Sequence, residues 1–177
     1  MVRASKRIEI LEAAARVVAR EGIGSMTFES VAEESGLTKG GILYHFRSRE
    51  EMLRGIHQHL ADTWEADMIA VGGGTWDTLT PTERLIAYID VATHGTTRTE
   101  LLLMLEGSTD PQLATAWNDV LTRWAPPINA EDALAEPAMI MARLAADGLW
   151  MYEALSESPL SPSARRAIAD HIVAGLA

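Results

Sequence analysis

The fold is decided by residues 27–49, which read TFESVAEESGLTKGGILYHFRSR. Thr27 and Thr38 each stand where a side-chain oxygen can cap the first turn of a helix. Gly36 lies between them, and glycine accepts the left-handed backbone with which many helices end. The stretch therefore predicts two short helices joined by a tight turn. This is the helix-turn-helix arrangement, whose second helix enters the major groove of DNA.

Each of these two helices should bury one face. In the first, Phe28, Val31 and Ala32 recur at helical spacing on one side, and acidic residues occupy the other. Ser30 stands where a capping box normally has Glu or Gln, so we expect an incomplete box at this helix. In the second helix, the inward side chains are expected to be Ile42, Leu43 and Phe46, and the outward residues Lys39, Gly41, Tyr44 and His45.

The order GLTKGGILYHF at residues 36–46, followed by RSREEML at 47–53, closely resembles the DNA-binding region of the TetR family of bacterial repressors. The specific part is LYHF with the basic-x-basic-Glu segment after it. The resemblance covers residues 5–60 and is architectural beyond them. It implies an all-α fold with a DNA-binding head of three helices over residues 1–47. A ligand-sensing and dimerisation domain is then expected over residues 48–177.

The charges of the chain are unevenly distributed. The chain has 177 residues and a formal net charge of −10. Residues 1–60 hold nine Lys and Arg against eight Asp and Glu, whereas residues 61–177 hold six against seventeen. An acidic remainder is repelled by phosphates and would help present the basic end to DNA. Solubility alone explains the acidic surface equally well.

The composition excludes several classes of protein. Hydrophobic residues make up 47% of the chain, which is ordinary for a globular protein and too high for a disordered one. The absence of cysteine excludes disulfides, thiol nucleophiles and Cys-ligated zinc. Charges interrupt the first apolar segment, and no uncharged apolar stretch approaches the roughly 18–20 residues that span a bilayer. We expect a cytoplasmic protein without a signal peptide, membrane contact, metal or cofactor.

Helical periodicity continues through the rest of the chain. A first helix is expected over residues 5–21, with a buried stripe of Ile8, Leu11, Ala15, Val18 and Ala19. Ser48 and Glu51 form a capping box that begins a long connecting helix ending near Val71. Its apolar stripe is Met52, Leu53, Ile56, Leu60, Trp64 and Met68. Further helices are expected over residues 80–93, 100–106, 110–124, 136–156 and 161–176, with a short turn at 130–135.

Several residues of the head are expected to contact DNA. Lys39 begins the second helix of the motif, where side chains reach base edges or phosphates. The resemblance implies that Tyr44 and His45 contact backbone phosphates, which position a protein without reading the sequence. Thr27, at a helix N-terminus, offers a hydroxyl and an amide to another phosphate.

Arg47 and Arg49 flank the start of the connecting helix, where the helix dipole disfavours positive charge. A phosphate partner would remove that penalty, so we assign both arginines to DNA contact. The alternative is a solvated pair that only balances Glu50 and Glu51. Beside the motif we favour the DNA contact.

Gly40 and Gly41 occupy positions where many members of the TetR family carry larger residues. Each glycine weakens a helix by roughly 1 kcal/mol relative to alanine. Either the backbone comes unusually close to the DNA groove, or specificity depends on Thr38, Lys39 and the shape of the DNA. Both explanations remain open at the level of sequence.

The helix expected over residues 136–156 is apolar on two sides, so it must be buried on two sides. One side holds Ile140, Leu144, Gly148, Met151, Tyr152 and Leu155, and the other holds Met141, Ala145 and Leu149. A glycine within a helix suggests close approach of another backbone. The resemblance implies a homodimer built as a four-helix bundle; packing within one chain is the alternative. The expected interface residues are Ile140, Leu144, Gly148, Met151, Leu155, Ile168 and Ile172.

The C-terminal part is rich in side chains that line ligand pockets, although each of them singly is more often plain core. The candidates for a site that binds a small, largely apolar effector are Trp64, Met68, His94, Met104, Trp117, Leu121, Met141 and Asp147. A buried carboxylate needs a partner. For Asp147 this is Arg98, Arg143 or a cationic ligand. His94 near Arg98 could instead bind an anionic ligand.

These features predict a ligand-responsive repressor that binds a palindromic DNA operator as a homodimer. A ligand would change the angle of the connecting helix and thereby the separation of the two heads, which must match successive major grooves. The alternative is a DNA-binding dimer without an effector. A fully packed core would favour that alternative, whereas an apolar cavity of roughly 300 Å³ or more would favour a sensor.

An enzyme is not expected. The sequence has no P-loop, no Gly-x-Ser-x-Gly and no His-Glu-x-x-His motif. His57 and His59 resemble metal ligands, but residues two apart on a helix do not face each other. His59 with Asp62 is more simply a surface pair.

Overall fold

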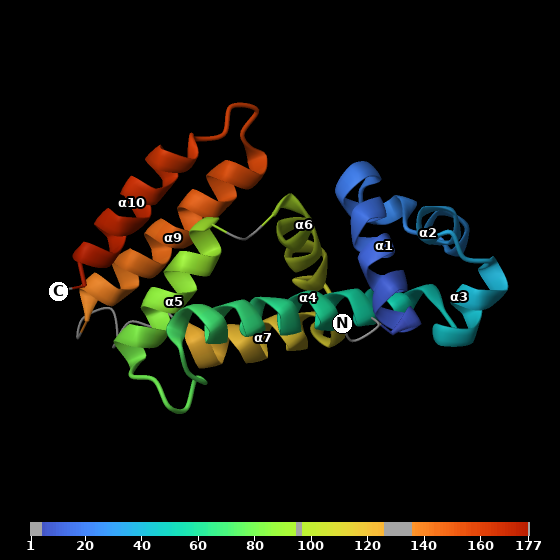
Figure 1. Ribbon diagram of the computed structural model, residues 1–177, viewed down its shortest axis with the longest axis horizontal. Coiled ribbons are helices and arrows are strands. Elements are labelled where there is room, and N and C mark those ends of the chain that lie inside the picture. The colour runs from blue at the N-terminus through green and yellow to red at the C-terminus, as the bar shows by residue number, and fades with distance from the viewer. Residues whose placement is uncertain (1–4, 95–96, 126–135, 177) are drawn as a thin grey trace. The chain divides into compact units, whose positions relative to one another are not determined.

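The computed structural model describes residues 5–94, 97–125 and 136–176, and within these ranges it contains helices and no strand (Figure 1). The all-α fold expected from the periodicity is confirmed. The helices are α1 (Lys6–Glu21), a short 3-10 helix η1 (Ile23–Ser25), α2 (Phe28–Ser35), α3 (Lys39–His45), α4 (Arg49–Gly72), α5 (Pro81–His94), α6 (Arg98–Gly107), α7 (Pro111–Trp124), α9 (Pro137–Leu155) and α10 (Pro162–Ala174). The turn expected at residues 130–135 lies outside the described residues.

The helices begin where hydroxyl side chains can cap them. Ser5, Thr27, Thr38 and Ser161 each accept a hydrogen bond from the backbone N–H three residues later. From residue 48 onward, every expected helix begins and ends within two residues of its expected position. The capping signals and the 3.6-residue period therefore fixed the helix boundaries locally, before any tertiary contact is considered.

The chain divides into two compact units. Unit 1 comprises Met1–Asp62 and Thr99–Trp117, and unit 2 comprises Thr63–Arg98 and Asn118–Ala177. Helices α4 and α7 contribute residues to both units. Unit 1 therefore holds the head helices α1–α3 together with α6, and unit 2 holds α5, α9 and α10.

The core of unit 1 is built from the head and from residues far along the chain. Phe46, Ile42 and Ile56 are fully buried, and Leu103 and Leu113 join the same cluster from α6 and α7. The stripe expected for α1 was partly wrong, because Ile8 and Ala19 are exposed. The buried residues of α1 are instead Ile10, Leu11, Ala13, Ala14, Val17 and Val18. Small alanine side chains at the centre of this face let α2 pack closely against α1.

The turn between α2 and α3 depends on glycine. Gly36 has a φ of +67°, in the left-handed region that side chains other than glycine rarely adopt. The N–H of Leu37 donates to the carbonyl of Ala32 (3.1 Å), which closes the end of α2. In α3, Ile42 is buried as expected, but Leu43 is exposed. Because Leu43 lies about 100° further around the helix than Ile42, the two side chains cannot both face the core.

Unit 2 is organised around α5, which packs against α9 and α10 (Figure 1). The carboxylate of Glu65 accepts hydrogen bonds from Arg123 at 2.7 and 2.6 Å and from the indole N–H of Trp124 at 3.0 Å. The bonds from Arg123 hold the pKa of Glu65 below its ordinary value. These contacts join α4 to α7 within unit 2.

No helix in the described part of the chain is both long and apolar enough to cross a bilayer.

Candidate nucleic-acid interface

Helix α3 presents an unusually exposed aromatic side chain. The side chain of Tyr44 is 85% exposed, and its ring meets the half-buried ring of His45 edge-on, with 5.1 Å between centroids. Thr38 begins the helix, and its hydroxyl accepts a hydrogen bond from the N–H of Gly41 at 3.1 Å. The cap and the buried Ile42 fix the rotation of α3, so Tyr44 points away from the core.

Lys39 has a partner that the sequence analysis did not foresee. Its ammonium donates to a carboxylate oxygen of Glu29 on α2 at 2.5 Å, and both side chains remain about half exposed. This hydrogen bond holds the pKa of Glu29 below its ordinary value. A phosphate that binds Lys39 would therefore compete with Glu29 for its charge. Only the folding of α2 against α3 brings these two residues together.

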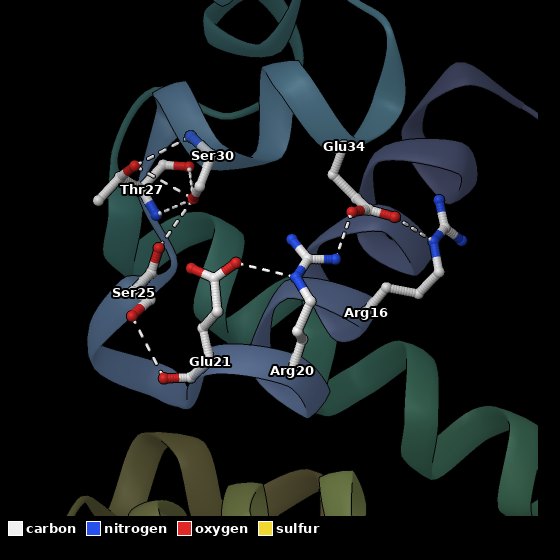
Figure 2. A network of polar contacts seen from close by, with 7 residues as sticks. All are labelled: Arg16, Arg20, Glu21, Ser25, Thr27, Ser30 and Glu34. Carbon is white, nitrogen blue, oxygen red and sulfur yellow. Dashed lines mark hydrogen bonds and ion pairs between the residues drawn. The ribbon is translucent and has the colours of Figure 1, made fainter.

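The start of α2 carries a complete capping box, which corrects the expectation of an incomplete one. The hydroxyl of Thr27 accepts from the N–H of Ser30 at 3.1 Å, and the hydroxyl of Ser30 accepts from the N–H of Thr27 at 2.9 Å. The hydroxyl of Ser30 also donates to the carbonyl of Ser25 at 2.8 Å, which helps to hold it in this position (Figure 2). The amide of Thr27 is thus already used, and its hydroxyl donates to the hydroxyl of Ser30 at 3.1 Å, so a phosphate at Thr27 would compete with Ser30.

A cluster of charges ties α2 to α1. Arg16 and Arg20 donate to the two carboxylate oxygens of Glu34 at 2.7 and 2.8 Å, and Arg20 also donates to Glu21 at 2.9 Å (Figure 2). The arginines hold the pKa of Glu34 below its ordinary value, Arg16 most strongly. Since α2 packs on α3, this cluster helps to set the position of α3 on the surface of unit 1.

Arg47 and Arg49 differ in what their side chains touch. The guanidinium of Arg49 donates to the backbone carbonyls of Met26 at 2.9 Å and Ile23 at 2.8 Å. Arg49 therefore holds the start of α4 against the η1 segment, which corrects the expectation that it faces DNA. The side chain of Arg47 is exposed and has no ion pair among the described residues. The positive charge of Arg49 contributes to lowering the pKa of Glu50, and the backbone N–H of Arg47 donates to Glu51 at 2.8 Å, so charge balance remains an alternative role for these arginines.

No neighbour within the head requires glycine at positions 40 and 41. A Cβ atom at Gly40 would lie 3.9 Å from the hydroxyl of Thr38, and one at Gly41 would lie 3.4 Å from it. Both are ordinary contact distances, and neither glycine has a positive φ. The reason for the two glycines therefore lies outside the head itself.

Several residues expected at a ligand site gather in unit 2. The ring of Trp64 lies 5.6 Å from that of Tyr88 and 5.8 Å from that of Trp150. Asp147 accepts a hydrogen bond from the hydroxyl of Tyr88, and its carboxylate lies 3.7 Å from the guanidinium of Arg143. Burial raises the pKa of Asp147. Arg143 was one of the expected partners, whereas Tyr88, 59 residues away in the chain, was missed.

The remaining candidates for a ligand site lie elsewhere. Met68 is buried and Leu121 half-buried in unit 2, whereas Met104 and Trp117 belong to unit 1. Met141 is 64% exposed, on the face of α9 opposite the core. His94 and Arg98 line a cavity of about 270 Å³ in unit 2. Its other lining residues include Thr93, Trp150, Glu153 and Arg165.

Helix α9 carries a second apolar face that the described residues leave about half exposed or more. We define this outer stripe as the exposed side chains Met141, Leu144, Met151, Tyr152 and Leu155. Gly148 lies within the stripe, and a Cβ atom there would meet nothing within 4 Å. On α10, Ile168 is exposed and Ile172 half-buried. Ile140 differs from the expectation because it is buried against its own chain.

The described residues hold no group of three or more His, Cys, Asp or Glu that could bind a metal ion.

The chain matches two family models. The model described as bacterial regulatory proteins, tetR family, matches residues 10–56, and the one described as tetracyclin repressor-like, C-terminal domain, matches residues 82–176. The HTH-type transcriptional regulator YfiR of Bacillus subtilis is 35% identical over 92 residues, which cover 51% of this chain. The match spans 42% of the length of YfiR.

Solved structures agree in fold. A transcriptional regulator from Rhodococcus sp. Rha1 superposes with a TM-score of 0.75 at 19% identity, and the match covers 97% of this chain and 96% of that one. A transcriptional regulator from Saccharomonospora viridis in complex with choline gives a TM-score of 0.68 at 22% identity, covering 96% and 94%. Since the C-terminal family model alone matches more than half of the sequence, the chain belongs to the tetR family of bacterial regulatory proteins.

Proposed function

We propose that the protein is a transcriptional repressor that binds a palindromic DNA operator as a homodimer and responds to a small effector. The observation that carries the proposal is the exposure of Tyr44 on the second helix of a helix-turn-helix motif. A phenol with its hydroxyl in water and its ring edge on His45 can donate to a phosphate. Repression is chosen because the resemblance is to a family of repressors.

The contacts with DNA divide by role. Tyr44, His45 and Arg47 suit the phosphate backbone, because their side chains end in polar or cationic groups. Among the described residues, the hydroxyl of Tyr44 and the guanidinium of Arg47 form no hydrogen bond or ion pair. Lys39 joins them by donating to a phosphate in competition with Glu29. Thr27 contributes its hydroxyl, and Thr38 caps the helix that carries the others. Arg49 holds the start of α4 and is not part of this surface.

Fluorescence anisotropy on a set of unrelated duplexes tests the phosphate assignment. Tyr44→Phe removes one hydroxyl and should weaken binding to every duplex by roughly tenfold, as loss of a hydrogen bond to a charged group does. A variant that changes only which duplex is preferred would show that Tyr44 reads bases instead.

The outer stripe of α9 supports the homodimer. Monomeric proteins rarely expose a contiguous apolar row along one helix, and a two-fold partner would cover it with an identical row. The free space at Gly148 suits the close approach of a partner backbone. Two heads related by a two-fold axis require an operator with two inverted half-sites.

The cavity beside Trp150 is the place in unit 2 that best suits an effector. Its volume of about 270 Å³ is close to the lower limit for small-molecule sites. Asp147 lies with Tyr88 and Arg143, so it needs no cationic ligand. The structural relative from Saccharomonospora viridis holds choline, but Arg98 and His94 favour an acidic group in this chain. We therefore propose an effector with an apolar body and one acidic group.

A thermal-shift screen of aromatic and aliphatic acids, followed by anisotropy with the compounds that bind, tests this effector. Binding should raise Tm, weaken operator affinity and be lost in Arg98→Gln. Arg166→Gln removes the same charge from an exposed position on α10 and should bind the acid normally. Equal operator affinity with and without the bound acid would favour the effector-independent dimer.

A further inference from the structure

We infer a second ligand site, in unit 1, that binds a small organic carboxylate in a groove between α1, α4 and α7. The residues that carry it are His57 and Arg54 of α4, Arg7 of α1 and Gln112 of α7. This site is separate from the effector cavity proposed for unit 2, and the inference does not rest on that cavity.

The groove has the size of a small-molecule site. Its volume is about 510 Å³, within the range of roughly 300–1,000 Å³ that such sites occupy. All of its lining residues belong to unit 1. Leu113 and Ala116 give it an apolar wall on α7, opposite the polar side chains of α4. A ligand with one apolar body and one polar end matches this division.

His57 supplies a hydrogen-bond donor at the floor of the groove. Its side chain is 1% exposed, and its Nδ1 accepts a hydrogen bond from the indole N–H of Trp117 at 2.8 Å. An indole N–H can only donate, so the proton of the neutral imidazole lies on Nε2. Burial lowers the pKa of His57 to about 4, so the ring is neutral near pH 7. Nε2 is buried, and no group among the described residues accepts a hydrogen bond from it.

An unpaired buried donor is costly, and an acceptor on a ligand would satisfy it. The hydrogen bond from Trp117 determines which kind of ligand group can bind to His57. Because Trp117 fixes the tautomer, His57 cannot present an acceptor to the groove at neutral pH. The ligand must therefore carry the acceptor.

The two arginines that line the groove, Arg7 and Arg54, also favour a negatively charged ligand. The guanidinium of Arg7 lies 4.6 Å from the ring centroid of Phe46, and the charge of Arg54 acts on Glu50, whose pKa it helps to lower. The charge of Asp110 acts on His57, whose pKa it raises against the larger effect of burial. Glu51 is the acidic member of the lining, and its carboxylate accepts from the backbone N–H of Arg47 at 2.8 Å. Guanidinium groups pair with carboxylates through two parallel hydrogen bonds. A carboxylate thus satisfies both the cations and the buried imidazole.

A phosphate of duplex DNA is a poorer occupant. Because Nε2 of His57 is buried, an occupant must displace the side chains above it, which a free molecule of a few heavy atoms does more readily than the backbone of a double helix. The occupant that fits is a compact acid with a flat or branched apolar part, of which benzoate is a simple representative.

Titration of the ¹⁵N-labelled full chain with benzoate tests the site. The indole N–H of Trp117, assigned by its loss in Trp117→Phe, should shift on binding because its acceptor His57 is polarised through Nε2. Benzamide has the same shape without the charge and should bind at least about tenfold more weakly. Arg54→Gln should weaken benzoate binding by about tenfold or more, and its exposed position spares the core.

Arg98→Gln is the matched control, since it removes the same charge from the cavity of unit 2. It should leave the shift of Trp117 unchanged even if it abolishes an effect in unit 2. The inference is wrong if neither benzoate nor succinate moves the Trp117 signal at about 20 mM, a concentration that detects fragment-sized ligands. It is also wrong if Arg54→Gln binds benzoate as tightly as the unaltered chain, or if Arg98→Gln alone removes the shift.

Discussion

Helices α3 and α9 both expose large side chains, but the chemistry of those side chains differs. On α3 the exposed aromatic is Tyr44, which ends in a hydroxyl and stands beside His45. On α9 the outer stripe ends mostly in methyl and thioether groups, as in Met141 and Leu155. A hydroxyl can bond to a phosphate, whereas methyl groups gain only from contact with other apolar surface. The chemical group at the end of an exposed side chain therefore indicates whether it binds DNA or another protein surface better than its exposed fraction does.

The two helices share a second property. Gly40 and Gly41 on α3 and Gly148 on α9 all lie where a Cβ atom would meet no close neighbour. Glycine lowers the stability of a helix, so a reason outside the protomer is needed for each. DNA is the proposed reason on α3, and a second copy of the chain is the proposed reason on α9.

The largest effect is expected from charging the outer stripe. Leu144→Asp combined with Leu155→Asp places two carboxylates where the partner would pack, and should convert a dimer into a monomer. Operator affinity should then fall at least about a hundredfold, because each head binds alone. Light scattering and anisotropy measure the two outcomes.

Leu105→Asp is the control for this variant. Leu105 is also large and exposed, but it lies on α6 in unit 1, outside the stripe. If the stripe variant stays dimeric, or if Leu105→Asp dissociates the dimer instead, the stripe is not the interface.

Arg49→Gln should give the next largest effect, on stability. The variant loses two hydrogen bonds to the carbonyls of Ile23 and Met26, and we expect unfolding to become easier by about 2 kcal/mol. Arg47→Gln should leave Tm unchanged and weaken DNA binding. Thermal unfolding and anisotropy of the pair distinguish the two roles. Equal Tm values for both variants would show that the hydrogen bonds of Arg49 do not stabilise the fold.

The contrast between these arginines shows which part of the site the sequence could predict. The positions of the helices are local properties and were predicted well, whereas the expected sides of α9 were partly wrong, because Ile140 is buried and Met141 is exposed. Arg49 could not be placed, because its acceptors lie 23 and 26 residues earlier in the chain. The pairs Lys39–Glu29 and Tyr88–Asp147 were missed for the same reason. Periodicity locates a face of a helix, but it does not say which distant group that face meets.

Gly41→Ala should have a smaller and informative effect. Alanine at this position should stabilise the head by about 0.5–1 kcal/mol, because the space is free and the helix propensity rises. If the backbone of α3 approaches the DNA groove closely, the same variant binds DNA more weakly despite its stability. If specificity instead depends on Thr38, Lys39 and DNA shape, affinity is unchanged. A fall in Tm would contradict the free space at Gly41.

The smallest effect is expected at Glu29. Glu29→Gln releases Lys39 and removes a negative charge from the DNA-facing side of the head, which should strengthen DNA binding by about threefold at low salt. Glu33→Gln removes the same charge from an exposed residue of α2 that does not pair with Lys39, and should have less effect. Anisotropy at two salt concentrations provides the comparison. A larger gain in Glu33→Gln would show that general charge, not the release of Lys39, governs the affinity.

Selection of bound duplexes from a random pool tests the central claim most directly, namely that two copies of α3 read two half-sites at once. The enriched sequences should contain inverted repeats whose centres lie about one helical turn, or a multiple of it, apart, with protomers bound in pairs. Enrichment of a single unrepeated site that binds one protomer would contradict the claim. So would a pool that shows no enrichment.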